Sequence, residues 1–393
     1  MSETQQQGIV IYNLKRKKYS PILLSLFFLI FLYTSLPVLT QNIKQINKYV
    51  RKADIEMYDN NFQEALQLYQ WAYKMDTSNA RVAFKMGICM YNMRKYKRSS
   101  LQHFETARRA GIAQATYYLG NLYHLRGKFE EAIEQFEVYK NISGEKEFNN
   151  ADIYALIGRS QTAIEFVATP ANVIIKNMGS TINSKYPDYV PVISADESVL
   201  IFTSRRPGST GGELDPLGEY FEDVYISTKQ DSQWTAPKNI SSNINTNTHD
   251  ACAGLSADGE LFFLYRTSKD LLSGDIYSSA FDSKDWTIPQ KLPSPVNTKE
   301  FVEPSASMSA DGQQIYFSSN RPGGYGKKDI YKAIKLADGE WSKAINLGTD
   351  VNTAEDEDSP FIHPDGKTLY FSSKDHKNMG GYDIFKTIFT PDP

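Results

Sequence analysis

The stretch RPGGYGKK, residues 321–328, has the composition of a loop that could cradle a phosphate group. A phosphate loop of the Walker type requires G-x-x-x-x-G-K-[ST] after a strand and before a helix. Here a strand-like run, Asp329-Ile330-Tyr331, follows instead, and related stretches recur at 204–212 and 372–385. One nucleotide site would not need several versions of itself. We therefore interpret the glycines as a link between two strands, where a sharp change of direction favours residues without a side chain.

Four carboxylates recur at one position of a repeat and form the candidate ligand-binding site: Asp188, Asp250, Glu303 and Glu357. Each precedes the Ser or His of a turn motif by six residues, at the start of a predicted first strand. If these strands line a channel, the carboxylates would ring one mouth of it and attract a cation or a basic peptide. The alternative is that they cap strand ends or pair with nearby arginines: Arg205, Arg206, Arg266 and Arg321.

Other residues that commonly do chemistry are sparse and poorly spaced. The five histidines, His103, His124, His249, His363 and His376, never fall at metal-ligand spacing. Neither H-E-x-x-H nor the nucleophile elbow G-x-S-x-G occurs. Cys89 and Cys252 are too few for a disulfide framework or a cysteine metal site. We therefore predict a protein without catalytic residues, metal or cofactor.

Length and charge limit the classes of protein that the chain can belong to. Its 393 residues suffice for two domains, at roughly 100 to 200 residues each. The net charge is -3, from 43 basic and 46 acidic residues, which gives no reason to expect a nucleic acid as partner. The 25 Tyr and 21 Phe suit many half-buried strands.

Residues 172–393 repeat with a period of about 54 residues, and four markers recur in fixed order. The first is a turn motif whose aspartates are Asp196, Asp258, Asp311 and Asp365. A D-[IV]-[YF] triplet follows at 223, 275, 329 and 383, then a Trp in three units and an N-T pair. Each unit offers about four strands, and such units bury their faces by radial stacking. The architecture predicted is an all-β propeller of four recognisable blades, whose repeated aspartates form hairpin turns.

Two ways of ending the ring remain open. Residues 172–184 match the end of a unit, whereas the last unit stops after its third strand, near Ile388. The N-terminal strand could therefore pair with the last three strands and close the ring without a free edge. Alternatively, the chain ends early and more blades follow. The first unit is longer than the others, which predicts a protruding loop over 206–222.

Residues 45–168 have the pattern of paired amphipathic helices, with apolar residues three and four positions apart. Leu119-Gly120, Phe129 and Phe136 resemble a tetratricopeptide repeat, in which small residues allow helices to cross closely. Gly87 precedes Gly120 by 33 residues, close to the period of about 34 in that family. The pattern predicts an α-helical superhelix of about three repeats and a closing helix, with a concave groove for a peptide or protein.

Residues 1–40 have the layout of a signal peptide or an N-terminal anchor. A basic cluster, Lys15 to Lys18, precedes an apolar stretch from Ile22 to Tyr33. That stretch is 12 residues long, and only by counting on to Leu39 does it approach the roughly 17 to 25 needed to span a bilayer. Whether residues 1–40 are a signal peptide or an anchor, we expect the chain after about residue 41 to lie outside the cytoplasm.

The repeating unit in 172–393 resembles the TolB-type, WD-repeat-like propeller blade. Together with the signal and the helical repeats, it is similar to PorE-like members of the OmpA family of Gram-negative envelopes. The resemblance covers nearly everything after residue 41. Such proteins usually continue into a regulatory-type β domain and an OmpA-like domain that holds peptidoglycan. Neither lies within these residues, so we expect a fragment, and the resemblance assigns peptidoglycan binding to no residue of this chain.

Two classes of function follow from these patterns. The first is a non-enzymatic scaffold in the periplasm, associated with the outer membrane, that binds envelope proteins through the helical groove or the propeller. The resemblance implies a link to type IX secretion or to the organisation of outer membrane and peptidoglycan. The alternative is a propeller that binds, or also hydrolyses, peptides or glycans.

Overall fold

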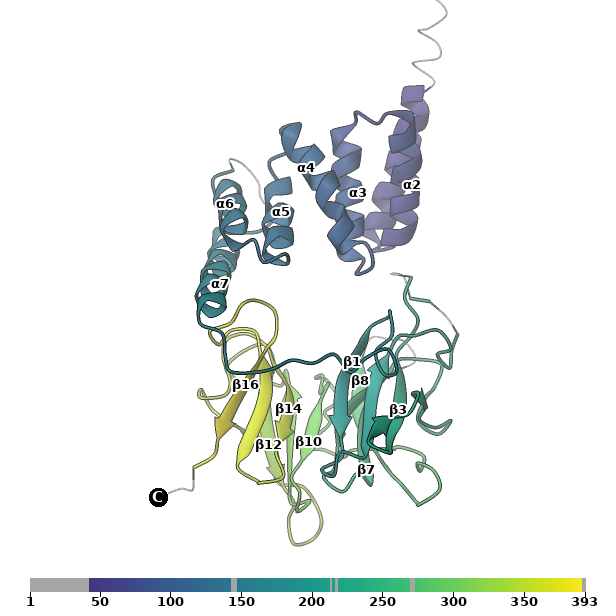
Figure 1. Ribbon diagram of the computed structural model, residues 1–393, viewed down its shortest axis with the longest axis vertical. Coiled ribbons are helices and arrows are strands. Elements are labelled where there is room, and N and C mark those ends of the chain that lie inside the picture. Colours follow the sequence, from purple (N-terminus) through teal and green to yellow (C-terminus); the bar gives the residue numbers. More distant parts are fainter. Residues whose placement is uncertain (1–41, 143–146, 213, 216–217, 269–272, 391–393) are drawn as a thin grey trace, which may run out of the picture.

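The computed structural model describes residues 42–142, 147–212, 214–215, 218–268 and 273–390, in which helices precede strands (Figure 1). The predicted signal or anchor at 1–40 lies outside the described residues. Within them, no helix has both the length and the apolar character needed to cross a membrane. The predicted fold class, helical repeats followed by a four-bladed β-propeller, is confirmed.

The helical region is a row in which each helix packs against the next. It contains a helix over 42–58, α2 (Phe62–Met75), α3 (Ala80–Asn92), η1 (Lys97–Ser100), α4 (Leu101–Arg109), α5 (Ala115–His124), α6 (Phe129–Lys140) and α7 (Asn150–Ala168). Neighbour-to-neighbour packing of this kind is what a stack of short repeats requires, because no single repeat buries its apolar face alone.

Small residues set the distance between paired helices. Gly120 on α5 lies against Phe136 on α6, so that a Cβ at Gly120 would be only 2.5 Å from the ring. Gly87 on α3 and Phe104 on α4 repeat this contact one repeat earlier. The Phe104 ring is fully buried and stacks on Tyr118 with ring centroids 4.6 Å apart. These glycines and aromatics therefore form the core of the repeats, as their spacing predicts.

The β region consists of four antiparallel sheets. Blade 1 contains β1 (Asp188–Ile193), β2 (Val199–Ser204), β3 (Asp223–Gln230), β4 (Gln233–Trp234) and β5 (Lys238–Asn239). Blade 2 contains β6 (Asp250–Leu255), β7 (Leu261–Thr267), β8 (Gly274–Ala280) and β9 (Gln290–Lys291). Blade 3 contains β10 (Ala306–Met308), β11 (Gln314–Ser319), β12 (Asp329–Ile334) and β13 (Ile345–Asn346). Blade 4 contains β14 (Glu357–Ile362), β15 (Thr368–Ser373) and β16 (Asp383–Ile388).

The repeated aspartates form the turns between the first and second strands, as predicted. In blade 3, Asp311 Oδ1 accepts hydrogen bonds from Ser309 Oγ at 2.6 Å and from Gln313 N at 3.0 Å. These bonds lower the pKa of Asp311 below its ordinary value. The next residue, Gly312, has φ +69°, a conformation that glycine adopts without strain. Equivalent carboxylate-to-backbone bonds hold the turns at Asp196, Asp258 and Asp365.

The first strands of the blades converge on a common axis, as the propeller prediction requires. Residues at the ends of β1, β6, β10 and β14 together line a small cavity of about 180 Å³. The residues that these four strands contribute include Ile193, Leu255, Met308 and Ile362. This end of the axis is therefore walled largely by apolar side chains, whereas the four predicted site carboxylates lie at or just before the opposite end of the same strands.

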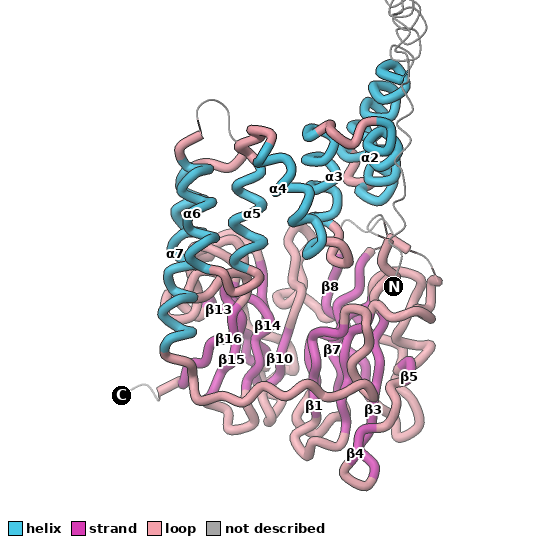
Figure 2. Tube along the Cα trace, turned by 45° about the horizontal axis from the view of Figure 1, so that its top comes forward, coloured by secondary structure: helices cyan, strands magenta, loops and turns pink. Residues whose placement is uncertain are grey.

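The predicted closure of the ring by residues 172–184 is not present. Residues 172–178 form no strand, and their apolar side chains are exposed: Val173 by 70%, Ile174 by 81% and Ile175 by 93%. Blade 4 consequently has three strands. The segment instead crosses from the end of α7 to β1 (Figures 1 and 2). Its far end is anchored in blade 1, where buried Ile182 packs with Leu200, Phe202 and Tyr225.

Candidate binding cavity between the helices and the first blade

Three of the four predicted site carboxylates, Asp188, Asp250 and Glu357, are the first residues of β1, β6 and β14, whereas Glu303 lies three residues before β10. Glu303 is fully buried, and its hydrogen bonds show most clearly how these carboxylates are held. Its carboxylate accepts hydrogen bonds from Thr298 N at 3.1 Å, Ser319 Oγ at 2.7 Å and Arg321 Nη2 at 3.1 Å. It thereby ties the end of the preceding unit to the second strand of its own blade.

The other three carboxylates repeat this arrangement with small changes. Asp188 bonds to Ser184, Ser204 and Arg206; Asp250 to Thr246 and Arg266; and Glu357 to Thr353 and Ser373. Burial alone would raise the pKa of Asp188, but the bonds from Ser204 and Arg206 outweigh it and leave that pKa below its ordinary value. For Asp188, Asp250 and Glu303 such geometry favours the alternative interpretation, pairing with arginines, whereas Glu357 has no arginine partner among the described residues. Ligand binding by the four carboxylates stays a prediction.

The glycine-rich loop RPGGYGKK joins β11 to β12, which confirms its interpretation as an inter-strand link. Its backbone N–H groups do surround an anion, namely the carboxylate of Asp329 at the start of β12. Tyr325 N and Gly326 N donate to this carboxylate at 2.6 and 3.0 Å. A Cβ at Gly324 would lie 2.5 Å from Asp329 Oδ2. The N–H groups of this loop that could bind an anion are therefore already occupied by the carboxylate of Asp329, a residue of the same blade.

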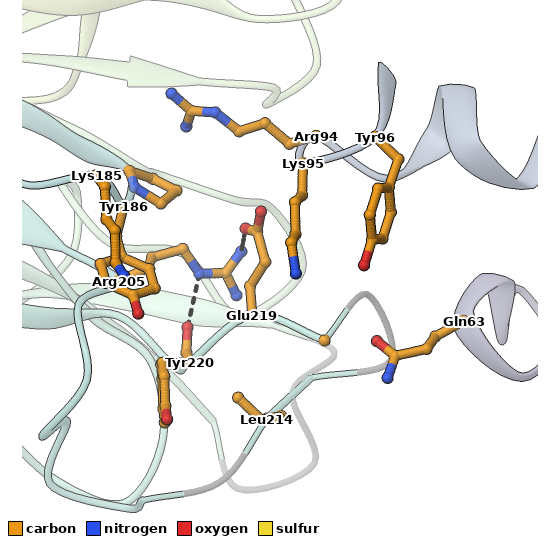
Figure 3. A pocket seen from close by; sticks show the side chains of 12 residues that line it. Gln63, Arg94, Lys95, Tyr96, Lys185, Tyr186, Arg205, Leu214, Glu219 and Tyr220 are labelled. Atoms are coloured by element: carbon orange, nitrogen blue, oxygen red, sulfur yellow. Dashed lines mark hydrogen bonds and ion pairs between the residues drawn. The ribbon is translucent and has the colours of Figure 1, made fainter. Parts of the chain in front are cut away.

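A larger cavity, of about 640 Å³, lies where the helical region faces blade 1 (Figure 3). Its volume falls in the range of roughly 300 to 1,000 Å³ that is usual for ligand pockets. The helical wall is made by Gln63 on α2 and by Arg94, Lys95 and Tyr96, which connect α3 to η1. The helical region and the propeller, the two modules of this protein, both contribute walls, so neither module alone would form this cavity.

The propeller wall begins with the segment that leads into β1. Lys185, Tyr186 and Pro187 line the cavity immediately before Asp188, the first residue of that strand. Lys185 is exposed, and its Nζ lies 5.4 Å from the centroid of the Tyr186 ring. The carboxylate of Asp188 accepts a hydrogen bond from Ser184 N at 2.6 Å, which ties down the chain just before Lys185. The repeated carboxylate thus positions the cavity wall rather than lining it.

The long loop of the first unit completes the propeller wall. Arg205, at the end of β2, forms ion pairs with Asp215 at 2.5 Å and Glu219 at 2.9 Å, and all three side chains are largely buried. These pairs fold the loop back on its own blade. The described residues of the long loop, predicted to protrude, thus fold back on blade 1 and reach the helices at Gly218, beside Gln63 on α2.

The loop and α2 approach each other closely at one glycine. A Cβ added to Gly218 would lie 2.1 Å from Oε1 of Gln63, and Gly218 has φ +76°. A side chain at this position would be strained because of the positive φ, and the end of the Gln63 side chain would have to move aside. Gly218 therefore marks the point where the loop of blade 1 meets α2 beside the cavity.

A second junction joins the helices to blade 4. His124 on α5 lies between Ser160 Oγ, 2.9 Å from Nδ1, and the Met379 carbonyl oxygen, 2.6 Å from Nε2. Because a carbonyl only accepts, Nε2 carries the proton. Burial lowers the pKa of His124 below its ordinary value. Lys377 and Glu165 add an exposed ion pair at 2.8 Å. The helical region thus bridges the first and last blades of the ring.

The sequence patterns did not reveal the cavity residues as a group. Tyr96 and Arg205 attract notice singly, as a repeat aromatic and a neighbour of a carboxylate, whereas Arg94, Lys95 and Lys185 have no recurring spacing. Their proximity follows from how the two modules dock. The one available signal was the extra length of the first unit, which marks blade 1 as different from the rest.

A comparison with known protein families agrees with the helical repeats. Residues 91–146 match the family model described as a tetratricopeptide repeat. No curated protein sequence matches the chain. Among solved structures, the tetratricopeptide repeat protein YrrB, described as having an unusual peptide-binding site, is 18% identical. That match covers 34% of this chain and 67% of YrrB with a TM-score of 0.28.

Two propeller structures match the rest of the chain at similar levels. The propeller domain of the trilobed protease from Pyrococcus furiosus, described as having an open velcro topology, is 8% identical over 52% of this chain and 55% of that chain, with a TM-score of 0.30. The α-L-arabinanase from Penicillium chrysogenum, solved with arabinobiose, is 14% identical over 52% and 64%, with a TM-score of 0.32. Likenesses at these levels assign no activity or ligand to this chain.

Proposed function

We propose that this protein is a non-enzymatic scaffold that binds a segment of a partner protein in the cavity between its helices and blade 1. The observation that carries the proposal is that both repeat modules, each of a kind that presents binding surfaces, contribute walls to one cavity of about 640 Å³. Three of its lining residues are tyrosines, Tyr96, Tyr186 and Tyr220, a residue type that is enriched at protein interfaces.

The proposed location is the periplasmic side of a Gram-negative envelope, in association with the outer membrane. It rests on the basic cluster and apolar stretch of residues 1–40 and on the resemblance to PorE-like members of the OmpA family. Participation in type IX secretion, or in the organisation of outer membrane and peptidoglycan, is proposed on the same resemblance. Fusion of a phosphatase reporter that is active only outside the cytoplasm, placed after residue 390, tests the location. An inactive fusion contradicts it.

Site-directed photocrosslinking in cells tests the binding function. A photoreactive phenylalanine analogue replaces Tyr96 or Tyr186 in the cavity, and Tyr154 on α7, which is 58% exposed and outside the cavity, serves as the matched control. The two cavity positions are expected to capture the same envelope protein, and the control position is not. The proposal would be refuted if the same proteins were crosslinked from all three positions, or if no protein were crosslinked from the two cavity positions. Turnover of a peptide or glycan library by the purified protein would refute its non-enzymatic part.

A further inference from the structure

The charges that line the cavity are strongly unequal. Among the described residues, four cations line it, Arg94, Lys95, Lys185 and Arg205, against one carboxylate, Glu219. Glu219 is already paired with Arg205, which also pairs with Asp215. The excess of positive charge is local, because the whole chain has a net charge of -3. A concave wall that concentrates one sign of charge attracts ligands of the opposite sign.

Three of these cations have no carboxylate partner among the described residues. Arg94, Lys95 and Lys185 are exposed side chains, and no ion pair within the described ranges includes them. The nearby Arg206, by contrast, bonds to Asp188 at 2.8 Å, as the repeat pattern of the propeller requires. Lys95 extends from the helical wall into the space above the blade 1 loop (Figure 3). These three charges are therefore available to an incoming ligand.

The rest of the lining indicates the kind of anion. Tyr96, Tyr186 and Tyr220 offer aromatic faces and hydroxyl groups, and Leu214 and Pro187 add apolar surface. Tyrosine and arginine are, with tryptophan, enriched at the energetic centres of protein interfaces. A small inorganic anion would leave this aromatic and apolar surface uncovered, whereas a polypeptide segment with mixed side chains would cover it.

We propose that the cavity binds an acidic segment of a partner polypeptide, with Asp or Glu carboxylates beside Arg94, Lys95 and Lys185. Apolar or aromatic side chains of the segment lie against Tyr96 and Tyr186. This inference rests on the proposed scaffold function and names the chemistry of its partner. It is opposite in sign to the basic ligand predicted for the ring of propeller carboxylates. Three of those carboxylates, Asp188, Asp250 and Glu303, pair with an arginine of their own blade, whereas the three cavity cations have no such partner among the described residues.

Fluorescence anisotropy with synthetic peptides tests the inference on the full chain. The probe is a labelled peptide that repeats Glu-Tyr-Glu-Leu, and its two controls carry Gln or Lys in place of every Glu. The Glu peptide is expected to bind about tenfold more tightly than the Gln peptide, and the Lys peptide is expected not to bind. Binding of the Glu peptide should weaken as salt is raised from about 0.05 to 0.5 M, because exposed charges are screened.

Charge-matched variants locate the binding site. Lys95→Glu combined with Lys185→Glu is expected to weaken binding of the Glu peptide by about tenfold or more, since attraction becomes repulsion. Lys343→Glu combined with Lys367→Glu changes the net charge equally at exposed positions outside the cavity and should leave binding unchanged. Both pairs lie on the surface, so neither is expected to impair folding. An equal loss in the two double variants would overturn the inference.

The outcomes separate this inference from the proposed function. If the Gln peptide binds as tightly as the Glu peptide, or the Lys peptide binds best, the acidic ligand is refuted while the scaffold proposal stands. If polyphosphate displaces the Glu peptide at the same concentration of charge, the assignment to polypeptide is refuted. If no peptide binds and photocrosslinking from Tyr96 captures no protein, the proposed function fails as well.

Discussion

Blades 3 and 4 share the turn motif and the D-I-[YF] triplet but differ at their outer edges. In blade 3, β13 pairs with β12 and Ile330 is completely buried. The equivalent residue of blade 4 is Ile384, which is 79% exposed because no fourth strand covers β16. Two residues in the same D-I-[YF] triplet therefore have opposite environments. The comparison teaches that a blade is completed by the segment that follows its third strand and not by the turn motif and triplet alone.

An asparagine at the end of each completed unit explains part of this difference. The Asn352 side chain accepts from Ile330 N at 2.7 Å and donates to Ile330 O at 3.0 Å, so it replaces a missing strand partner. Asn245 and Asn297 do the same in blades 1 and 2. The matching residue for blade 4 is Asn183, whose side chain instead accepts from Met178 N at 3.1 Å.

The helices hold blade 4 from another side. His124 bonds to the Met379 carbonyl oxygen, and Arg159 donates to the Lys374 carbonyl oxygen at 3.3 Å. Both acceptors lie in the loop between β15 and β16. The blade without a fourth strand is thus the blade that docks on α5 and α7. Four experiments test how much of the stability of each blade comes from its own edge.

The largest difference is expected between the two isoleucines. Ile330→Ala removes a fully buried side chain and should lower the free energy of unfolding by about 2 to 5 kcal/mol. Ile384→Ala removes an exposed one and should change it by less than about 0.5 kcal/mol. Denaturant unfolding followed by circular dichroism measures both. Equal losses would mean that the edge of β16 is covered in solution.

The asparagines give the next largest effect. Asn352→Ala leaves the buried N–H and carbonyl of Ile330 without these partners, which should cost about 1 to 3 kcal/mol. Asn183→Ala should cost less than about 0.5 kcal/mol, because its side chain holds only a turn in the linker. Thermal and denaturant unfolding of the two variants provide the test. A similar loss of stability in both variants would show that Asn183 bonds to the backbone of β16 in solution and so closes the ring.

Loss of the hydrogen bond from His124 to the Met379 carbonyl oxygen should lower the free energy of unfolding by about 0.5 to 1.5 kcal/mol, the usual contribution of one hydrogen bond. The effect should depend on pH. Burial lowers the pKa of His124 in the folded protein, so its contribution is complete above the unfolded value of about 6.5 and is lost as pH falls from there through the folded pKa.

Unfolding of wild type and His124→Gln from pH 7.5 to about 5 measures this dependence. Glutamine can donate to Met379 without titrating, so the variant should lose less stability than wild type as pH falls. His103, whose pKa burial also lowers, is present in both proteins and cancels in the difference. Parallel pH profiles would contradict the assignment of the effect to His124.

The smallest effect is expected for the ion pair between the helices and blade 4. Lys377 and Glu165 are 58% and 59% exposed, so a double-mutant cycle to alanine should give a coupling energy of about 0 to 1 kcal/mol. The pair of Lys328 and Asp358, which joins blades 3 and 4, has side chains only 22% and 16% exposed and should couple more strongly. A reversed order would show that docking of the helices stabilises blade 4 more than contact with blade 3 does.

Prediction from sequence worked best where the cause of a structure is local. The turn at Asp311 depends on hydrogen bonds to residues two positions away, and the helix pairing at Gly120 depends on the next helix. Prediction failed for residues 172–178, whose likeness to the end of a unit suggested a strand. Their conformation depends on α7 and blade 1, to which their two ends are joined.

The sequence by itself therefore determined the two kinds of repeat, the number of blades and the hairpin turns, because each of these arises from side chains and backbone groups that are neighbours in the chain. Only the tertiary structure decided that three of the four carboxylates pair with an arginine, that Glu357 does not, and that the edge of β16 is uncovered. It also brought Lys95 and Lys185 to one cavity. That cavity depends on the docking of the helices on blade 1, and contacts between residues so far apart leave no periodic trace in the sequence.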